Sequence, residues 1–175
     1  EMCIRDRRYG ISICVAGATS SGKTTLAGWL LTTIPDGKRI FTIENGSREL
    51  ALVREKDGKV TNSVIHTLTR YSENEKQNID QDMLLDMALR FNPEIICVGE
   101  MRSSEAYTAQ ESARTGHTVL TTIHSNSCES TYSRMRTLCK RKYDMDDEVL
   151  MDLVTEAFPI VVFTKQLENL SLIHI

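Results

Sequence analysis

The sequence predicts an α/β fold in which helices flank a mostly parallel sheet. Two observations lead to this prediction: strand-sized apolar runs alternate with segments of helical periodicity, and a Gly/Ser/Thr cluster joins the first strand to the first helix. Strands separated by helices need right-handed crossover connections, which bury the sheet on both faces. The chain has 175 residues, 41% of them hydrophobic, so we expect one sizeable core and one domain over residues 9–168.

The first half of the chain contains three predicted strands, a helix and a polar insertion. Residues 11–16 (ISICVA) form the first apolar strand, and residues 24–34 carry apolar side chains at helical spacing. The segment 39–43 (RIFTI) is rich in β-branched and aromatic residues, whereas 63–70 (SVIHTLTR) alternates like a half-buried strand. Between these strands the polar stretch 54–60 (REKDGKV) has a glycine turn, so we expect an antiparallel insertion there.

The second half alternates helices with strands. A helix over 79–91 is predicted to turn one apolar face toward the core, and Asn92-Pro93 ends it. The residues assigned to that face are Ile79, Met83, Leu84, Met87 and Ala88. Strands are expected at 94–98, at 118–123 and from Pro159 onward. The remaining helices are expected to begin at caps formed by Ser103, Ser127 and Asp146.

Composition excludes several classes of protein. The longest apolar runs are far shorter than the roughly 20 residues that span a bilayer, so no membrane-spanning segment is expected. A formal net charge of −3 argues against wholesale nucleic-acid binding, and no direct nucleic-acid partner is expected. The basic run 134–142 (RMRTLCKRK) is interpreted as the cationic end of a helix, with a partner-binding patch as the alternative. The five cysteines show no metal-binding or C-x-x-C spacing, as is typical of a reduced cytosolic protein.

The two ends differ from the rest of the chain. Residues 1–7 and 169–175 are expected to be non-native, because EMCIRDR and LSLIHI resemble translated sequencing-adapter sequence. We therefore leave them out of the fold prediction.

Residues 17–24 (GATSSGKT) match the phosphate-loop pattern G-x-x-x-x-G-K-[ST] in full, between a predicted strand and a predicted helix. Glycines at both ends of the pattern allow consecutive backbone N–H groups to turn toward a β-phosphate. Lys23 is placed for the β- and γ-phosphate oxygens, and the hydroxyl of Thr24 for Mg²⁺. Thr25 either contacts the α-phosphate, which we favour, or only begins the helix. The residues expected to bind ATP are Gly17, Ala18, Thr19, Ser20, Ser21, Gly22, Lys23, Thr24 and Thr25.

Polar residues follow three other predicted strands at the edge where parallel sheets bind ligands. Glu100 comes after a Walker-B-like strand that has no terminal Asp, so we expect its carboxylate to orient and deprotonate the attacking water. Glu44 either holds magnesium through water or shares the attacking water with Glu100. His124 is expected to hydrogen-bond the γ-phosphate or the acids. His117, at the opposite end of its strand, is expected to stabilise the fold or a subunit interface.

Three arginines are candidates for neutralising transition-state charge, directly or across a subunit boundary. Arg102, two residues after Glu100, is the strongest of them. Arg70 stays open between this role and an ion pair. Arg90, inside a predicted helix, is better explained by a surface or interface ion pair.

Four motifs in this order resemble those of the secretion-superfamily ATPases, the motors of type II and type IV secretion, pilus assembly and conjugation, over roughly residues 10–168. GATSSGKTT is similar to their phosphate loop and FTIENGSREL to their acidic box. LRFNPEIICVGEMRSSEA is similar to their atypical Walker B motif and GHTVLTTIHSNS to their histidine box. The tight spacings GE-x-R-x-x-E and GH-x₆-H make the resemblance specific.

The resemblance implies a RecA-like ATPase domain, the C-terminal catalytic domain of a longer protein whose N-terminal domain is missing here. It also implies ATP and Mg²⁺ as cofactors, a homo-oligomer in the form of a hexameric ring, and an inner-membrane platform protein as partner. The expected location is cytoplasmic, at the inner face of the cell membrane. By the same resemblance Lys23 and Thr24 match the nucleotide and magnesium ligands, and Glu100, Glu44 and His124 match the catalytic glutamate, the acidic-box acid and the histidine-box residue.

The sequence departs from the family pattern in its acidic box. Asn45 follows Glu44 where the family usually has Asp, and the spacing to Glu49 is one residue longer, which shifts the magnesium-holding role to Glu44. Arg102 and Glu105 match the GE-x-R-x-x-E pattern. The alternatives are an unrelated P-loop kinase or DNA motor, and a nucleotide-binding ring subunit without catalytic activity.

Overall fold

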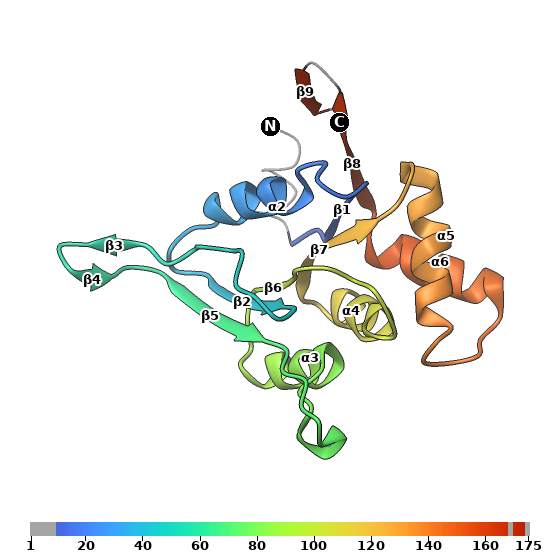
Figure 1. Cartoon of the computed structure of the whole chain (residues 1–175), viewed down its shortest axis with the longest axis horizontal. Helices are drawn as coiled ribbons and strands as arrows, with labels where there is room; N and C mark the ends of the chain where they lie inside the picture. The colour runs from blue at the N-terminus through green and yellow to red at the C-terminus, as the bar shows by residue number, and fades with distance from the viewer. Residues whose placement is uncertain (1–9, 168–169, 174–175) are drawn as a thin grey trace.

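The computed structural model describes residues 10–167 and 170–173. Its centre is a seven-stranded sheet with the order β5-β2-β6-β7-β1-β8-β9, parallel from β5 to β8, with β9 antiparallel to β8 (Figure 1). The strands are β1 (Ile13–Gly17), β2 (Arg39–Glu44), β5 (Ser63–Leu68), β6 (Ile95–Val98), β7 (Thr118–His124), β8 (Ile160–Leu167) and β9 (Leu170–Ile173). The predicted α/β fold with a mostly parallel sheet is confirmed. Of the ends expected to be non-native, 1–7, 169 and 174–175 lie outside the described residues.

Two hydrophobic cores fill the layers on either side of the sheet. One core contains side chains of α2 (Lys23–Thr32), and the other those of four later helices. These are α3 (Gln81–Arg90), α4 (Glu105–Arg114), α5 (Cys128–Cys139) and α6 (Asp147–Ala157). Successive residues of β1 alternate between the layers, because Ile13 and Val15 pack with α2 whereas Cys14 and Ala16 pack in the other core. Burial on both faces explains why the strands are continuous apolar runs.

The helix caps predicted at Ser127 and Asp146 are confirmed. The hydroxyl of Ser127 accepts from the N–H of Ser130 (3.0 Å), and the N–H of Ser127 donates to the Ser130 hydroxyl (2.9 Å). This reciprocal pair satisfies two backbone donors at the start of α5. Asp146 accepts from the N–H of Glu148 (2.8 Å) at the start of α6.

The cap predicted at Ser103 is wrong. Helix α4 begins at Glu105 after Ser104, and the described contacts include no side-chain cap from Ser104. Instead, the carboxylate of Glu105 turns back and accepts from the N–H groups of Ser103 (2.7 Å) and Arg102. The longer carboxylate side chain reaches donors that lie before the helix, which a serine hydroxyl at position 103 does not.

The apolar face predicted for α3 is only partly right. Leu84 and Ala88 are buried, but Met83 is 55% exposed and Met87 is 38% exposed. The buried residues of α3 are Gln81, Leu84, Leu85 and Ala88, which follow the i, i+3, i+4, i+7 spacing of one helix face. The helix begins at Gln81 and packs between β2 and α4, so the inward face is rotated toward Leu85.

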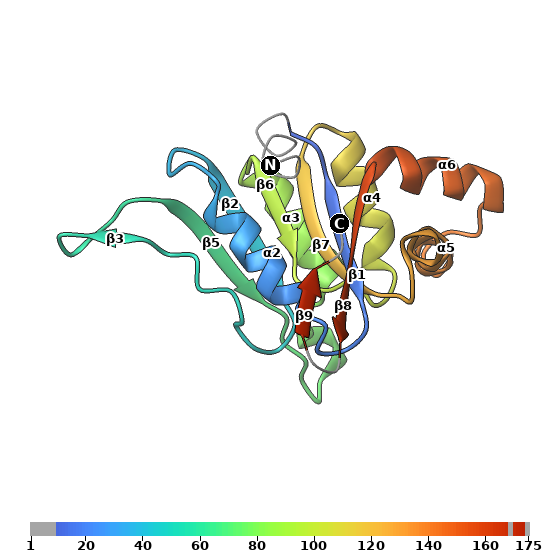
Figure 2. The ribbon, with the colours of Figure 1, turned by 90° about the horizontal axis from the view of Figure 1, so that it is seen from above.

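The polar insertion is the antiparallel hairpin of β3 (Glu55–Lys56) and β4 (Lys59–Val60), which closes around Asp57 and Gly58 at positive φ. Figure 2 shows this hairpin projecting far from the body of the protein. The expected antiparallel insertion is therefore present. Strand β5 is not part of it, because β5 runs parallel to β2 at the edge of the main sheet.

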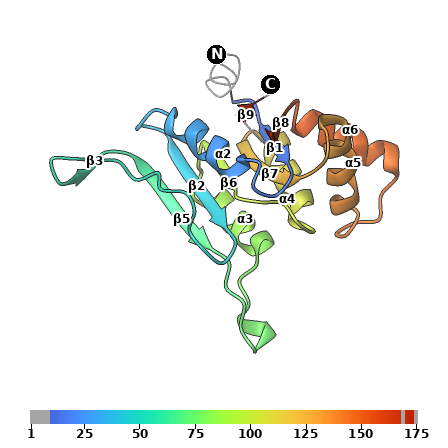
Figure 3. The ribbon, with the colours of Figure 1, turned by 45° about the horizontal axis from the view of Figure 1, so that its top comes forward.

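A second projection lies between β5 and α3. Its tip carries the short 3-10 helix η1 (Glu75–Gln77), and its base is closed by reciprocal backbone hydrogen bonds between Arg70 and Ile79 of 2.9 and 2.8 Å (Figure 3). Because Ile79 is held in this bridge, it lies outside the helix in which the sequence placed it.

The basic run 134–142 makes contacts within the chain. Arg136 and Lys140 pair with Asp147 at the start of α6, where a cation at the end of one helix meets an acid at the beginning of the next. Arg141 and Lys142 extend to the loop after β6 and to α3. The interpretation as the cationic end of a helix holds for these residues.

The cysteines that the sequence places in apolar strands are buried. Cys14 and Cys97 lie in strands at the centre of the sheet, as expected. Burial raises the pKa of the Cys14 thiol, and it raises the pKa of Cys139 to about 12, so these two side chains stay protonated at neutral pH. No helix in the described ranges is long and apolar enough to cross a membrane.

Candidate active site

The phosphate loop connects the buried strand β1 to the first turn of α2. Gly22, directly before α2, has a φ of 87°, and Ser20 has a φ of 61°, so both lie in the left-handed region. These conformations turn the loop back on itself, and the N–H of Ser21 donates to the carbonyl of Ala18 (3.3 Å). Among the described contacts no side chain caps α2, which leaves its first N–H groups for an anionic ligand.

Strand β8 holds the beginning of the loop through Thr164. The hydroxyls of Ser21 and Thr164 lie 2.9 Å apart, and that of Thr164 also donates to the carbonyl of Ala16 (3.2 Å). A Cβ added to Gly17 would lie only 2.5 Å from the Ser21 hydroxyl oxygen and 2.7 Å from that of Thr164. Gly17 is therefore required for close packing against β8 as well as for the turn of the loop.

Lys23 lies over the loop at the start of α2, with only 7% of its surface exposed. Its ammonium donates to the carbonyl of Ala18 (2.6 Å). Burial lowers the pKa of Lys23, and the nearby Glu100 carboxylate partly offsets this effect. The ammonium is thus held beside the loop by a neutral carbonyl, a partner that a phosphate oxygen can replace.

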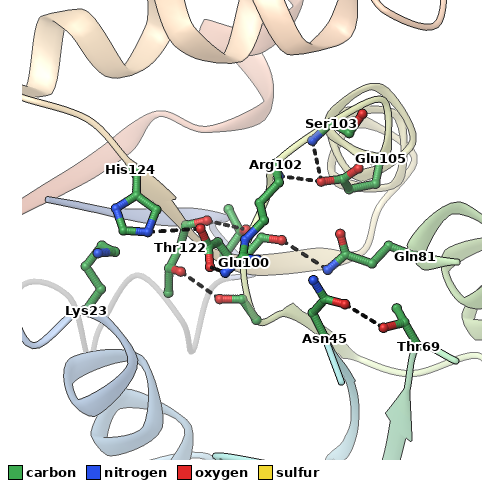
Figure 4. A network of polar contacts seen from close by, with 12 residues as sticks. Lys23, Asn45, Thr69, Gln81, Glu100, Arg102, Ser103, Glu105, Thr122 and His124 are labelled. Carbon is green, nitrogen blue, oxygen red and sulfur yellow. Dashed lines mark hydrogen bonds and ion pairs between the residues drawn. The ribbon is translucent and has the colours of Figure 1, made fainter. Parts of the chain in front are cut away.

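Glu100 contacts the side chains of Arg102 and His124 at the ligand-binding edge of the sheet (Figure 4). One carboxylate oxygen lies 2.5 Å from Nη2 of Arg102, and the other lies 3.0 Å from Nε2 of His124. Hydrogen bonding to Glu100 raises the pKa of Arg102. The Glu100 side chain is 17% exposed, whereas those of Arg102 and His124 are 59% and 42% exposed, so either of these two side chains can leave the carboxylate without disturbing the core.

Glu44 ends β2 and is almost fully buried. One of its carboxylate oxygens accepts from the N–H groups of Glu49 (2.6 Å) and Leu50 (2.9 Å), which fixes the loop of the acidic box against α2. The other oxygen, Oε1, is buried and has no hydrogen-bond partner in the described part of the chain; it lies 3.7 Å from Nδ1 of His66. The amide oxygen of Asn45 accepts from the hydroxyl of Thr69 (2.6 Å).

A cleft between α2, β2 and β6 brings these groups together. Its lining includes Thr24, Glu44, Asn45, Glu100 and Arg102. The Thr24 hydroxyl and the unpartnered carboxylate oxygen of Glu44 are oxygen ligands of the kind that Mg²⁺ prefers, and Mg²⁺ commonly keeps several bound waters. The residues present therefore fit a magnesium ion, which Thr24 and Glu44 would hold.

Other residues singled out in the sequence lie away from this cleft. Arg70 is exposed at the base of the second projection, and Arg90 is exposed at the far end of α3. Within residues 10–167 and 170–173, neither arginine makes an ion pair, so the intrachain form of the pair proposed for Arg90 is not seen. His117 precedes β7 at the opposite edge of the sheet from His124.

Sequence reasoning missed several residues that support the site. Gln81 donates to the carbonyl of Glu100, and the hydroxyl of Thr122 donates to the carbonyl of Gly99 (2.6 Å). His66 faces Glu44 from the neighbouring strand. Gln81 and His66 lie in no motif, whereas Thr122 lies inside the histidine-box-like run GHTVLTTIHSNS. The one available signal was for Thr122, which lies two residues before His124 on β7 and is therefore on the same side of the strand.

A family model and several known proteins match this chain. The model described as "Type II/IV secretion system protein" matches residues 4–162. The type IV secretion system protein VirB11 of Bartonella quintana is 29% identical over 169 residues, which cover 90% of this chain and 43% of that protein. The protein transport protein HofB homolog of Haemophilus influenzae is 35% identical over 144 residues, which cover 79% of this chain and 27% of that protein.

Solved structures share the fold. The VirB11 ATPase from the Brucella suis type IV secretion system, crystallised with sulphate, aligns with a TM-score of 0.81 at 28% identity and covers 98% of this chain. The pilus retraction motor PilT with bound ADP aligns with a TM-score of 0.69 at 22% identity and supports the fold alone. This chain spans less than half the length of each of these four relatives.

Proposed function

Because the family model covers residues 4–162, this chain belongs to the type II/IV secretion system protein family, and from that premise we propose that it is the ATP-hydrolysing core of a secretion, pilus-assembly or conjugation motor. The observation that carries the proposal is one cleft in which Glu100 lies beside the phosphate loop and its two carboxylate oxygens contact the exposed side chains of Arg102 and His124. The RecA-like domain over residues 9–168 would be the catalytic part of a longer subunit.

The phosphate loop binds the triphosphate of ATP. The free N–H groups at the start of α2 accept the β-phosphate, and Lys23 exchanges the carbonyl of Ala18 for β- and γ-phosphate oxygens. The residues from Gly17 to Thr25 surround the phosphates. Thr24 and Glu44 would hold Mg²⁺, which would neutralise charge on the phosphates.

Glu100 is the base that takes a proton from the attacking water. The water oxygen bonds to the γ-phosphorus, the bond from that phosphorus to the bridging oxygen breaks, and ADP and phosphate leave. In the structure one carboxylate oxygen of Glu100 contacts Arg102 and the other contacts His124, so release of either side chain frees an oxygen for the attacking water. We assign this release to binding of the γ-phosphate, which competes for the exposed side chains of Arg102 and His124.

The wider setting of the motor rests on the family. The VirB11 ATPase from the Brucella suis type IV secretion system, which is 28% identical to this chain and shares its fold, supports a role in transport machinery for the present chain. We propose a homo-hexameric ring at the cytoplasmic face of the inner membrane, bound to a platform protein of a secretion or pilus system.

The substitution Glu100→Gln tests the function. It should leave ATP affinity unchanged and reduce turnover by about 10²- to 10⁴-fold, because the amide does not accept the proton of water. Lys23→Ala should lose ATP binding itself. Glu55→Gln, on the exposed hairpin, removes the same charge far from the cleft and should keep wild-type turnover.

Phosphate release and nucleotide affinity are measured on the purified protein. Wild-type turnover in the Glu100→Gln variant would refute the assignment of the base. ATP binding without phosphate release in the wild type would indicate a regulatory ring subunit. DNA-stimulated hydrolysis with a steep salt dependence would indicate a DNA motor.

A further inference from the structure

The backbone of the segment that carries Glu100 is fixed almost group by group. The N–H of Gly99 donates to the carbonyl of Ile43 on β2 (2.8 Å), and its own carbonyl accepts from the Thr122 hydroxyl (2.6 Å). The N–H of Met101 donates to the carbonyl of Thr122 on β7 (2.9 Å). These contacts attach the segment to the strands on either side of β6.

The carbonyl of Glu100 itself points away from the strands and is bound by a side chain. Nε2 of Gln81 donates to this oxygen at 3.0 Å (Figure 4). Gln81 is the first residue of α3 and is only 7% exposed. A buried amide in this position is costly unless it is hydrogen-bonded, so the contact also determines where the Gln81 side chain lies.

The turn that presents Gln81 is anchored on both sides. Asp80 caps α3 by accepting from the N–H of Met83 (2.8 Å). Asp82 accepts from the hydroxyl of Ser104 (3.0 Å), just beyond the Glu100 segment, and from the ammonium of Lys142 (2.9 Å). The first turn of α3 therefore contacts the segment at its beginning through Gln81 and at its end through Asp82.

We propose that Gln81 is a positioning residue for Glu100, which it orients by holding the Glu100 carbonyl. The inference rests on the proposed function, because it assumes that the Glu100 carboxylate is the catalytic base. The peptide group after Glu100 is bonded at both ends, at its carbonyl by Gln81 and at the N–H of Met101 by Thr122, so the Gln81 bond helps to hold the backbone from which the Glu100 side chain extends. Catalysis is sensitive to such movement, since a displacement of about 1 Å can cost about 10²-fold in rate.

The predicted effect of losing this contact falls on turnover and not on binding. Gln81 makes no contact with the phosphate loop among the described hydrogen bonds, and Lys23 and Thr24 keep their places without it. We expect Gln81→Met, which preserves the volume of the side chain but has no donor, to lower kcat by about 10- to 100-fold. KM and the affinity for ATP should change by less than about threefold.

Two further variants separate positioning from folding. Gln81→Glu keeps the shape of the side chain and replaces the donor with an oxygen, so its kcat should fall at least as far as that of the Met variant. Gln110→Met is the matched control, because Gln110 is fully buried in the neighbouring helix α4 and, within the described part of the chain, its side-chain amide hydrogen-bonds only Glu111 (2.9 Å). The control should keep wild-type kcat even where its thermal stability falls.

Phosphate release, ATP affinity and Tm are measured for the purified wild type and the three variants, each assayed well below its own Tm. A fall in kcat for both Gln81 variants, with ATP affinity retained and the control active, supports the inference. Wild-type kcat in either folded Gln81 variant overturns it, as does an equal fall in the control. A wild type that binds ATP but releases no phosphate refutes the proposed function, and with it this inference, whereas failure of the inference alone leaves wild-type turnover intact.

Discussion

Asp82 holds three structural elements together, so its replacement by Asn should lower stability by a predictable amount. The carboxylate accepts from Ser104 (3.0 Å) and Thr108 (2.5 Å) around the start of α4 and from Lys142 (2.9 Å) after α5. The ammonium of Lys142 also donates to the hydroxyl of Thr108 (2.7 Å). The pair of Asp82 and Lys142 is about a quarter exposed, at 23% and 29%.

The magnitude follows from these contacts. A hydrogen bond to a charged group contributes about 1.5–3 kcal/mol, but partial exposure reduces the value for the ion pair. Asparagine keeps one acceptor oxygen for a hydroxyl and loses the charge that Lys142 contacts. We therefore expect Asp82→Asn to lower the free energy of unfolding by about 1.5 kcal/mol, or the Tm by roughly 3–6 °C for a domain of this size.

The pH dependence gives an independent check. Burial raises the pKa of Asp82, but the hydrogen bonds from Thr108, Lys142 and Ser104 outweigh it and lower the pKa below its ordinary value of 3.8. A lowered carboxyl pKa contributes stability that is present above pH 3.8 and is lost as the pH falls through the folded-state pKa. The difference in free energy of unfolding between wild type and Asp82→Asn should therefore be largest at neutral pH and become smaller in acid.

Urea and thermal unfolding at several pH values measure the free energy of unfolding and the Tm. Asp86→Asn is the control, because Asp86 is exposed one turn further along α3 and loses the same charge. The reasoning fails if the free energy of unfolding of Asp82→Asn lies within about 0.5 kcal/mol of the wild-type value, the range usual for surface changes. It also fails if Asp86→Asn lowers the free energy of unfolding as much as Asp82→Asn does.

Two further predictions concern the phosphate loop and a buried histidine. Gly17→Ala should abolish ATP binding, measured with a fluorescent nucleotide, because the added Cβ would collide with Thr164. In Gly22→Ala the added Cβ meets no atom within 4 Å, so this variant should lose only about 1–2 kcal/mol to its left-handed backbone. Equal ATP affinities in the two variants would contradict this prediction. Burial lowers the pKa of His66 below its ordinary value of 6.5, so wild-type stability should fall as the pH drops below about 6.5, where the unfolded chain binds the proton first. His66→Gln should flatten that part of the Tm profile, and parallel profiles would argue against the assignment.

Local patterns predicted the parts of the molecule that depend on residues close in sequence. The phosphate loop needs only the spacing of Gly17, Gly22 and Lys23 between a strand and a helix, and the structure has that order. The caps at Ser127 and Asp146 bond donors within three residues of themselves. Such features follow from backbone geometry and are visible in a short window of sequence.

Errors occurred where a neighbouring element decided between local options. The face of α3 was misassigned because Met83 and Leu85 are both apolar, and only the positions of β2 and α4 determine which one is buried. The cap at Ser103 was misassigned because α4 begins only after Ser104, and the Glu105 carboxylate turns back to the N–H groups of Arg102 and Ser103. Helical periodicity alone does not resolve either choice.

The sequence by itself determined the class of fold, the phosphate loop and the acids and histidine at the ends of parallel strands, because these depend on local spacing and on the rule that such strands end at one edge. Tertiary structure alone decided how those groups are held. The hydroxyls of Ser21 and Thr164 meet across 143 positions of sequence, and Gln81 reaches Glu100 across 19. Contacts of this kind depend on the order in which strands pair and helices pack, and no short stretch of residues encodes that order.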